Sequence, residues 1–337
     1  MDPRFPGGTS SAVADEIPVL SDIATLSFVG TKSAMFSKMP VNTRLARTLD
    51  EAGLDINWDP KLVQADTIVV HNPSFLKFNS RWQVRLACDT LVVVCHENFL
   101  LPDGSEAFDI EKGLTLLDDA ALCRRRLLAP VSAYNRKTIT DWAEEKHLNW
   151  TIASEDWTNI CAAEMIPPTA TPTDRRGRHS RPGHEKFPRR AEMEQSFPPS
   201  ADANVILGAD HLIADDTPDH WSLFPFGGMS VTKFFDMIDF YVYFTNPGWR
   251  ESFGRVLAEA TAAGKLVITD PGTASTFGDG VIGASPDEVD GIIAAHVSDP
   301  ARYQATVGKA QKQLGKFGPD AFLERVSNIL ADERIEA

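Results

Sequence analysis

The sequence has few cysteines and no metal-binding or disulfide pattern among them. Only four occur in 337 residues, namely Cys88, Cys95, Cys123 and Cys161, and no two are spaced as C-x-x-C. This pattern excludes a disulfide-stapled domain and the common zinc-binding modules. We therefore expect a protein of the reducing cytoplasm.

The sequence also lacks long apolar runs and an excess of positive charge. No uninterrupted apolar run approaches the ~20 residues that a membrane-spanning helix requires, and the first residues do not resemble a secretion signal. The formal net charge is -14, with 47 acidic and 33 basic side chains. Such a charge repels polyanions, so we expect no nucleic acid among its partners.

The composition is that of a folded α/β protein. Hydrophobic residues make up 43% of the 337 residues and charged residues 24%, which suits about two globular domains. Residues 1–16 are small, polar and proline-bearing, and predict a flexible N-terminal tail. Short β-branched runs at 23–29, 67–70 and 90–95 predict buried strands, and the patterns at 41–52 and 138–146 predict helices.

A proline- and threonine-rich stretch at 167–173 predicts a linker between the domains. Beyond it, strands are predicted at 204–207, 240–244 and 266–269, and helices at 251–263, 286–295 and from 300 to the end. Alternating strands and helices indicate two doubly wound α/β domains with parallel sheets, at 17–166 and 167–337. We leave open that the C-terminal helices pack back on the first domain.

The segment 239–271 carries the clearest chemical signal. A buried strand, a loop and a helix predicted to begin near Ser252 form the kind of edge at which open α/β sheets bind ligands. Ser252 and Gly254 suit a phosphate, because the helix N-terminus offers free N–H groups. Glu259 lies off the apolar face and suits sugar hydroxyls, and Glu251 at the helix entry could address the group beyond the phosphates. Alternatively, Glu251 interacts only with the helix dipole and Glu259 is a solvated surface residue.

A second segment, 175–190, has a positive net charge although the chain as a whole is negative. It holds seven arginines and lysines against one glutamate, a net charge of +6. Arg181 and Lys186 within it suit a diphosphate. The alternatives are an exposed basic loop or a patch that touches anionic lipid headgroups at the inner face of a membrane, which would make the protein peripheral there.

The run Glu251-Ser252-Phe253-Gly254, with Glu259-Ala260 following, resembles the E-x7-E signature of retaining GT-B glycosyltransferases of the glycosyl-transferases-group-1 family. The resemblance implies two Rossmann-like domains that face a central cleft. It implies that Glu251 lies near the donor sugar, that Ser252, Phe253 and Gly254 contact sugar or phosphate, and that Glu259 holds the ribose. Glu251 is thereby a candidate catalytic residue.

Other segments extend the resemblance. Gly177-Arg178 with Arg181 and Lys186 resembles the family's diphosphate-binding element, in a version associated with bacterial surface polysaccharides. Trp221 and Phe226 occupy the place where the family contacts the nucleotide base, although both also fit a hydrophobic core. In the first domain, His96 and His71 each follow a predicted strand, and His96 is the preferred candidate for the family's catalytic-site histidine.

The resemblance implies transfer of a sugar from a nucleotide diphosphosugar to a carbohydrate or lipid-linked glycan acceptor. No strict D-x-D occurs, so we expect no metal and no cofactor besides the donor substrate. The alternatives are a nucleotide-sugar epimerase or phosphorylase with the same fold, and a carbohydrate-binding or assembly component without catalysis.

Overall fold

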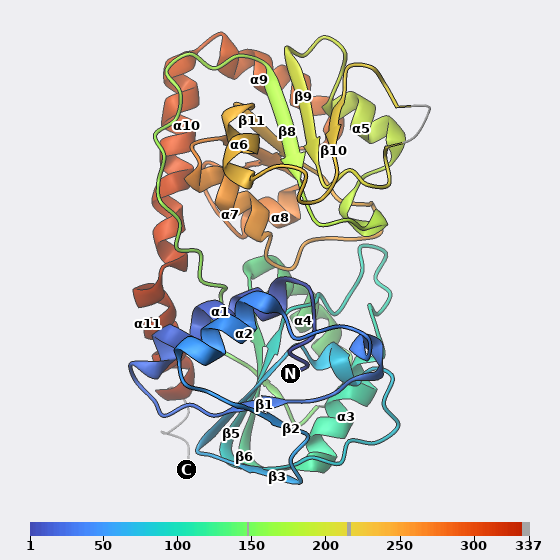
Figure 1. Ribbon diagram of the computed structural model, residues 1–337, viewed down its shortest axis with the longest axis vertical. Helices are drawn as coiled ribbons and strands as arrows, with labels where there is room; N and C mark the ends of the chain where they lie inside the picture. The colour runs from blue at the N-terminus through green and yellow to red at the C-terminus, as the bar shows by residue number, and fades with distance from the viewer. Residues whose placement is uncertain (147, 214–216, 332–337) are drawn as a thin grey trace. The chain divides into compact units, whose positions relative to one another are not determined.

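The chain folds as two compact α/β units (Figure 1). The computed structural model describes residues 1–146, 148–213 and 217–331. Unit 1 contains Met1–Ile160 and the C-terminal helix α11 (Pro319–Ala331), and unit 2 contains Cys161–Gly318. The sequence places the boundary at 166–167 instead, and residues 332–337 of the predicted C-terminal helical run lie outside the described residues. Within the described ranges, no helix is long and apolar enough to cross a membrane.

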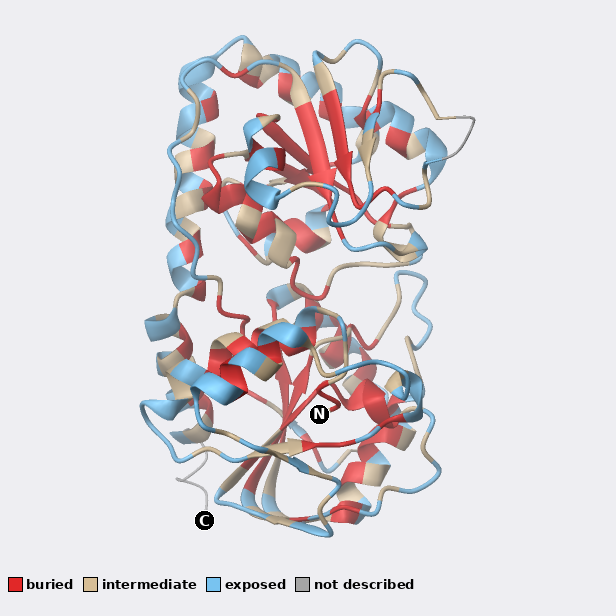
Figure 2. Cartoon of the chain, viewed as in Figure 1, coloured by how far each residue is buried: buried red, intermediate tan, exposed pale blue. Residues whose placement is uncertain are grey.

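The core of unit 1 is a parallel sheet centred on one long strand. Its strands are β3 (Leu62–Gln64), β4 (Thr67–His71), β5 (Arg85–Cys95), β6 (Ala121–Pro130) and β7 (Thr151–Ile152). β5 pairs with β6 on one side and with both β3 and β4 on the other. The carboxyl-terminal half of β5 is buried throughout (Figure 2), which confirms the strand predicted at 90–95.

The N-terminal segment is a packed helix and not a flexible tail, so that prediction is wrong. Helix α1 (Gly8–Ser21) buries Val13 and Ile17 against Leu45 and Leu49 of helix α2 (Thr43–Glu51). Among the small and polar residues of this segment, Val13, Ala14 and Ile17 form an apolar stripe. The segment folds as a helix that buries this stripe.

The predicted strand at 23–29 is largely wrong as well. Only β1 (Phe28–Gly30) is a strand, and it pairs with β2 (Ile56–Trp58) as a separate two-stranded sheet. The helix predicted at 41–52 is confirmed as α2, whose first turn is capped by the Asn42 side chain. The remaining helices of unit 1 are α3 (Ile110–Ala120) and α4 (Ala133–Glu144).

Unit 2 is built on a six-stranded parallel sheet. The strand order is β10-β9-β8-β11-β12-β13. The strands are β8 (Arg175–His179), β9 (Ala203–Leu207), β10 (Ser222–Phe224), β11 (Phe240–Tyr243), β12 (Leu266–Thr269) and β13 (Ile282–Gly283). Continuous buried runs predicted β9, β11 and β12, as expected where helices cover both faces of a sheet.

Helices connect most of the strands of unit 2, and two further helices follow β13. They are α5 (Arg190–Ser196), α6 (Val231–Asp236), α7 (Arg255–Ala262), α8 (Pro271–Ser275), α9 (Val289–Val297) and α10 (Pro300–Gln313). α7 is bracketed by Gly254 and Gly264, with φ values of 88° and 75°. Glycine adopts this left-handed conformation without the strain that a side chain would bring.

The packing of α1 yields the first prediction. Ile17 is 5% exposed and Ile23 is 55% exposed, so Ile17→Ala and Ile23→Ala form a matched pair. We expect Ile17→Ala to lower the free energy of unfolding of unit 1 by about 2–5 kcal/mol, because it leaves a cavity beneath α1. Ile23→Ala should change it by less than about 0.5 kcal/mol. Urea denaturation with hydrogen exchange of unit 1 amides measures both, and equal effects would contradict this packing.

Candidate functional site

The sheet of unit 2 has a topological switch point between β8 and β11. From β8 the chain proceeds outward through β9 and β10, and then returns to place β11 on the opposite side of β8. Figure 1 labels these strands. Ligands of open α/β sheets bind outside the carboxyl ends of the strands at such a point. The segments that follow β8 and β11 are therefore the candidate site.

The arginines within β8 are structural. Arg176 is 1% exposed and pairs with Asp174 and Asp290, each at 2.7 Å. Arg178 is fully buried, and its guanidinium lies 4.1 Å from the Phe187 ring centre and 4.8 Å from that of Tyr243. The guanidinium also donates to the carbonyl oxygens of Lys186 and Phe244. Burial lowers the pKa of Arg178, with nearby tyrosines and Glu251 acting against this.

This burial argues against the alternative in which residues 175–190 form an exposed basic loop. Besides the two buried arginines, Arg175 pairs with Asp239 at 2.8 Å and Arg190 pairs with Glu194 at 2.7 Å. The alternative of a membrane contact depended on this segment, and most of its charge is internal or paired. Strand formation explains the difference, because β8 lies at the centre of the sheet, where side chains on both faces are covered.

Lys186 and Glu251 form an ion pair across the switch point. Glu251 Oε1 accepts hydrogen bonds from Lys186 Nζ and from the Tyr243 hydroxyl, each at 2.6 Å. The two charged side chains are only 14% and 13% exposed. Burial raises the pKa of Glu251, but the adjacent Lys186 charge and both hydrogen bonds outweigh this and hold the pKa below its usual value. Glu251 is therefore an ionised carboxylate at neutral pH.

Arg181 lies in the same segment and remains accessible. Its guanidinium pairs with Glu185 at 2.8 Å, and the side chain is 46% exposed. Exposed pairs of this kind contribute little to stability. Arg181 can therefore exchange Glu185 for an incoming anion at small cost.

Glu259 is held by two basic side chains. Its carboxylate lies 3.2 Å from His179 Nε2 and 3.3 Å from Arg255 Nε, and the side chain is 37% exposed. Burial raises the pKa of Glu259, but the hydrogen bond with His179 and the charges of His179 and Arg255 keep it below its usual value. His179, which ends β8, is a site residue that the sequence interpretation missed.

The loop that precedes α7 differs from its prediction. The helix begins at Arg255, not near Ser252, and Gly254 caps it. Phe253 points into the core, where its ring lies 5.2 Å from that of Phe317. Ser252 is 8% exposed. Ser252, Phe253 and Gly254 thus offer a ligand chiefly their backbone at the start of α7.

The two candidate base-binding aromatics have different environments. Trp221 is 5% exposed, and its indole N–H donates to the Phe197 carbonyl oxygen at 2.8 Å. This is a core position, which corrects the base-stacking interpretation of Trp221. Phe226 is 62% exposed, and its own backbone N–H donates to the Asp210 carboxylate at 2.9 Å. Phe226 therefore presents a ring that is free to stack.

Four buried polar atoms at or after the carboxyl ends of β8, β9 and β11 have no hydrogen-bond partner among the described residues. They are His179 Nδ1, Ser180 Oγ, His211 Nδ1 and Trp249 Nε1. Buried polar groups in folded proteins are normally paired. Their convergence on three adjacent strands indicates a polar ligand at this edge, although neither composition nor spacing singled these residues out.

His96 belongs to unit 1, where it lies beside His71. His96 follows β5, His71 ends β4, and His71 Nδ1 lies 3.1 Å from His96 Nε2. These two strands pair directly, so the contact follows from the sheet order. The structure thus brings Lys186, Glu251 and the 252–254 loop together in unit 2, and places His96 at the corresponding edge of unit 1.

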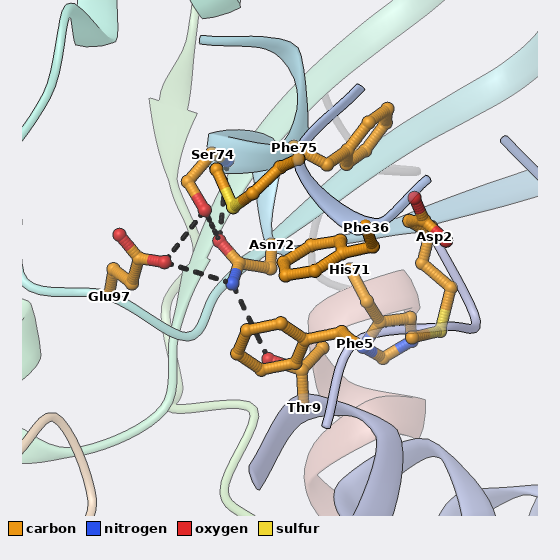
Figure 3. A pocket seen from close by; sticks show the side chains of 11 residues that line it. Asp2, Phe5, Thr9, Phe36, His71, Asn72, Ser74, Phe75 and Glu97 are labelled. Atoms are coloured by element: carbon orange, nitrogen blue, oxygen red, sulfur yellow. Dashed lines mark hydrogen bonds between the residues drawn. The ribbon is translucent and has the colours of Figure 1, made fainter. Parts of the chain in front are cut away.

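A pocket with a polar wall adjoins His71 (Figure 3). Asn72 donates to Glu97 at 3.2 Å and to Thr9 at 3.4 Å, and Ser74 donates to Glu97 at 2.7 Å. Phe5, Phe36 and Phe75 contribute aromatic rings to the same pocket. Asn72 has a φ of 56°, a strained backbone conformation of the kind that often marks functional sites.

Two units with parallel doubly wound sheets, and a polar site at the switch point of the second, define a GT-B fold. HepE of Anabaena, solved with UDP and glucose, matches with a TM-score of 0.66 and 13% identity, covering 98% of each chain. The pneumococcal O-GlcNAc transferase GtfA, solved with UDP and GlcNAc, matches with a TM-score of 0.54 and 14% identity, over 88% of this chain and 62% of that one.

An α-glucosyltransferase solved with UDP-glucose and DNA containing an abasic site has a TM-score of 0.54 and 13% identity, with 96% of each chain covered. At these identities the likeness establishes the fold. No family model and no curated protein matches the sequence.

The buried ion pair yields the second prediction. Lys186→Met leaves Glu251 buried without its cation, and we expect unit 2 to lose about 3–5 kcal/mol of unfolding free energy at pH 7. In the native protein, the low pKa of Glu251 contributes stability that is present above the unfolded pKa and is lost as the pH falls. Without Lys186, burial dominates and raises the Glu251 pKa. Protonation of Glu251 should therefore restore part of the unfolding free energy that the variant loses.

Urea denaturation at pH 7 and near pH 4.5 measures this effect, with the exposed Lys309→Met as the matched control. The deficit of Lys186→Met should shrink at the lower pH, and adding Glu251→Gln should recover part of it at pH 7. A deficit that does not change with pH would contradict the ion pair.

Proposed function

We propose that this protein is a glycosyltransferase that moves a sugar from a nucleotide diphosphosugar to a hydroxyl acceptor. The observation that carries the proposal is the pairing of an ionised, buried Glu251 with Lys186 at the switch point of unit 2. Glu259 with His179, and the start of α7, lie in the same unit. The solved structures with this fold support the proposal, because three of them were determined with UDP or a UDP-sugar.

The diphosphate of the donor would bind Arg181, Lys186 and the backbone of 252–254. Lysine carries three donors, so Lys186 can keep its bond to Glu251 and still reach a phosphate oxygen. The N-terminus of α7 adds a positive partial charge. Glu259 would accept hydrogen bonds from the ribose hydroxyls, and Phe226 would stack on the base.

Charge development explains the use of these residues in catalysis. As the glycosidic bond breaks, negative charge collects on the departing diphosphate and positive charge on the sugar ring. Arg181, Lys186 and the α7 dipole would stabilise the departing anion, and the Glu251 carboxylate would face the sugar. His96 remains the unit 1 candidate for a contact to the transferred sugar. The E-x7-E resemblance supports transfer with retention and a donor sugar of hexosyl type.

The acceptor side would use unit 1. Asn72, Ser74 and Glu97 present amide, hydroxyl and carboxylate groups suited to sugar hydroxyls, next to aromatic rings suited to sugar faces. The resemblance of segment 177–182 supports an acceptor from bacterial surface polysaccharide synthesis, either a carbohydrate or a lipid-linked glycan.

The third prediction concerns donor binding. Arg181→Ala and Glu259→Ala each remove hydrogen bonds to or from a charged group, which contribute about 1.5–3 kcal/mol each, so the Kd for the preferred nucleotide diphosphate should rise about 10- to 100-fold. Isothermal titration against UDP, GDP and ADP measures the effect. Arg302→Ala, which removes an exposed arginine of α10, is the matched control and should leave the Kd unchanged. If neither site variant weakens any nucleotide diphosphate, the proposed donor site is wrong.

The fourth prediction concerns metal ions. We propose that transfer is metal-independent, because Arg181, Lys186 and the α7 N-terminus offer positive charge to the diphosphate. Turnover of the preferred donor should therefore persist in excess EDTA, and the product should be a glycoside and not an epimerised donor or a sugar phosphate. Loss of turnover in EDTA with recovery on adding Mg²⁺ or Mn²⁺ would overturn metal independence.

A further inference from the structure

A buried glutamate lies behind the two histidines of unit 1. Glu16, on α1, is 1% exposed, and its Oε2 lies 3.5 Å from His71 Nε2. His71 in turn contacts His96 through its other ring nitrogen, Nδ1, at 3.1 Å. Glu16, His71 and His96 are therefore linked by successive contacts, and the array ends at the half-buried His96. We call these three residues the Glu16 array.

The Glu16 carboxyl group has few polar neighbours. Oε2 accepts a hydrogen bond from the buried Trp157 indole N–H at 3.1 Å. Oε1 is buried and has no hydrogen-bond partner among the described residues. Glu16 and His71 also border a cavity lined mainly by apolar side chains of α1, β1 and the sheet, which include Val13, Ile17 and Phe28. Among the described residues, His71 is the titratable side chain that contacts Glu16.

Imidazole chemistry makes this array directional. A neutral histidine has one N–H and one lone pair, so the hydrogen bond made by one nitrogen fixes the role of the other. If Glu16 donates to His71 Nε2, then His71 Nδ1–H donates to His96 Nε2, and His96 carries its proton on Nδ1. If Glu16 accepts from His71 Nε2–H, both rings reverse, and His96 Nδ1 becomes an acceptor.

We propose that Glu16 is a positioning residue that acts through His71 to determine which ring nitrogen of His96 carries the proton. His96 Nδ1 faces away from this array, and no described residue hydrogen-bonds to it. Glu16 and His71 therefore determine whether His96 Nδ1 donates to a substrate hydroxyl or accepts from it. The consequence for catalysis rests on the proposed function. The effect of Glu16 on the His96 tautomer does not.

The titration of the array supports the donor state at neutral pH. Burial raises the pKa of Glu16 to about 8, with the Trp157 hydrogen bond opposing this and the charge of Asp15 adding to it. Burial also lowers the pKa of His96 to about 3. It lowers that of His71 well below its usual value, helped by His96 and by the α-amino group of Met1. Both rings are therefore neutral near pH 7, and Glu16 is protonated.

These pKa changes predict how the hydrogen bonds of the array change with pH. Below about pH 8, neutral Glu16 donates and His96 presents an Nδ1–H donor, suited to a substrate oxygen. Above that pH, Glu16 is ionised and accepts, and His96 Nδ1 presents a lone pair. One ionisation on α1 thus reverses the hydrogen-bonding role of a group at the end of β5.

Nitrogen NMR of the full chain with ¹⁵N-labelled histidine tests the proposal without any donor. The His96 resonances are assigned by their loss in His96→Gln. In the native protein, His96 should change from the Nδ1–H to the Nε2–H tautomer with a midpoint near pH 8. Glu16→Gln should abolish this change, because an amide does not ionise in this range and the His96 tautomer should then be the same at every pH.

Glu106→Gln is the matched control, since Glu106 also accepts a tryptophan indole N–H, from Trp142 at 2.8 Å, but contacts no histidine among the described residues. It should leave the His96 titration unchanged. A His96 tautomer that stays constant in the native protein, or that titrates identically in Glu16→Gln, would overturn the proposal. If Glu16→Gln does not fold, the native titration alone decides. Because no nucleotide is used, this result is separate from whether the protein transfers sugars.

Discussion

The ion pair between Lys186 and Glu251 joins the two sides of the unit 2 switch point. Lys186 comes from the segment after β8, and Glu251 from the segment after β11. Neither charge is stable alone in so buried a position, so the two segments must be held together. Tyr243 is the last residue of β11, and its hydroxyl donates a hydrogen bond to the same carboxylate. This bond fixes the direction of the Glu251 side chain. The electrostatics of the candidate donor site depend on this arrangement.

Buried arginines provide the frame around that pair. Arg178 is held between Phe187 and Tyr243 and donates to the carbonyl oxygens of Lys186 and Phe244. It therefore ties the backbone after β8 to the backbone after β11, directly behind the ion pair. Because a guanidinium presents its donors in a fixed planar fork, it positions both segments more rigidly than a lysine can. The positive charge nearest a donor diphosphate comes instead from Lys186 and the accessible Arg181.

The sequence indicated the sheet and the two glutamates, but not the burial of charge. Runs of β-branched residues predicted β9 and β12, since such runs are typical of parallel strands buried on both faces. Glu251 and Glu259 were found because the run around them resembles the E-x7-E signature, whereas their spacing alone also fits surface positions. Arg176 and Arg178 were misinterpreted because arginine is usually exposed, and only the place of β8 in the sheet order buries them. The contact of Glu16 with His71 was likewise not predictable, since it depends on how α1 packs and on which strands pair.

The central claim is that a nucleotide diphosphate binds the carboxyl edge of unit 2 at the switch point. Amide hydrogen exchange of the full chain, measured with and without saturating UDP, tests it most directly. The account predicts slower exchange in two segments, residues 180–186 and 246–257, which bring together Arg181, Lys186, Glu251 and the start of α7. Slower exchange confined to other segments, or no change with UDP, GDP or ADP at concentrations up to the millimolar range, would contradict the account.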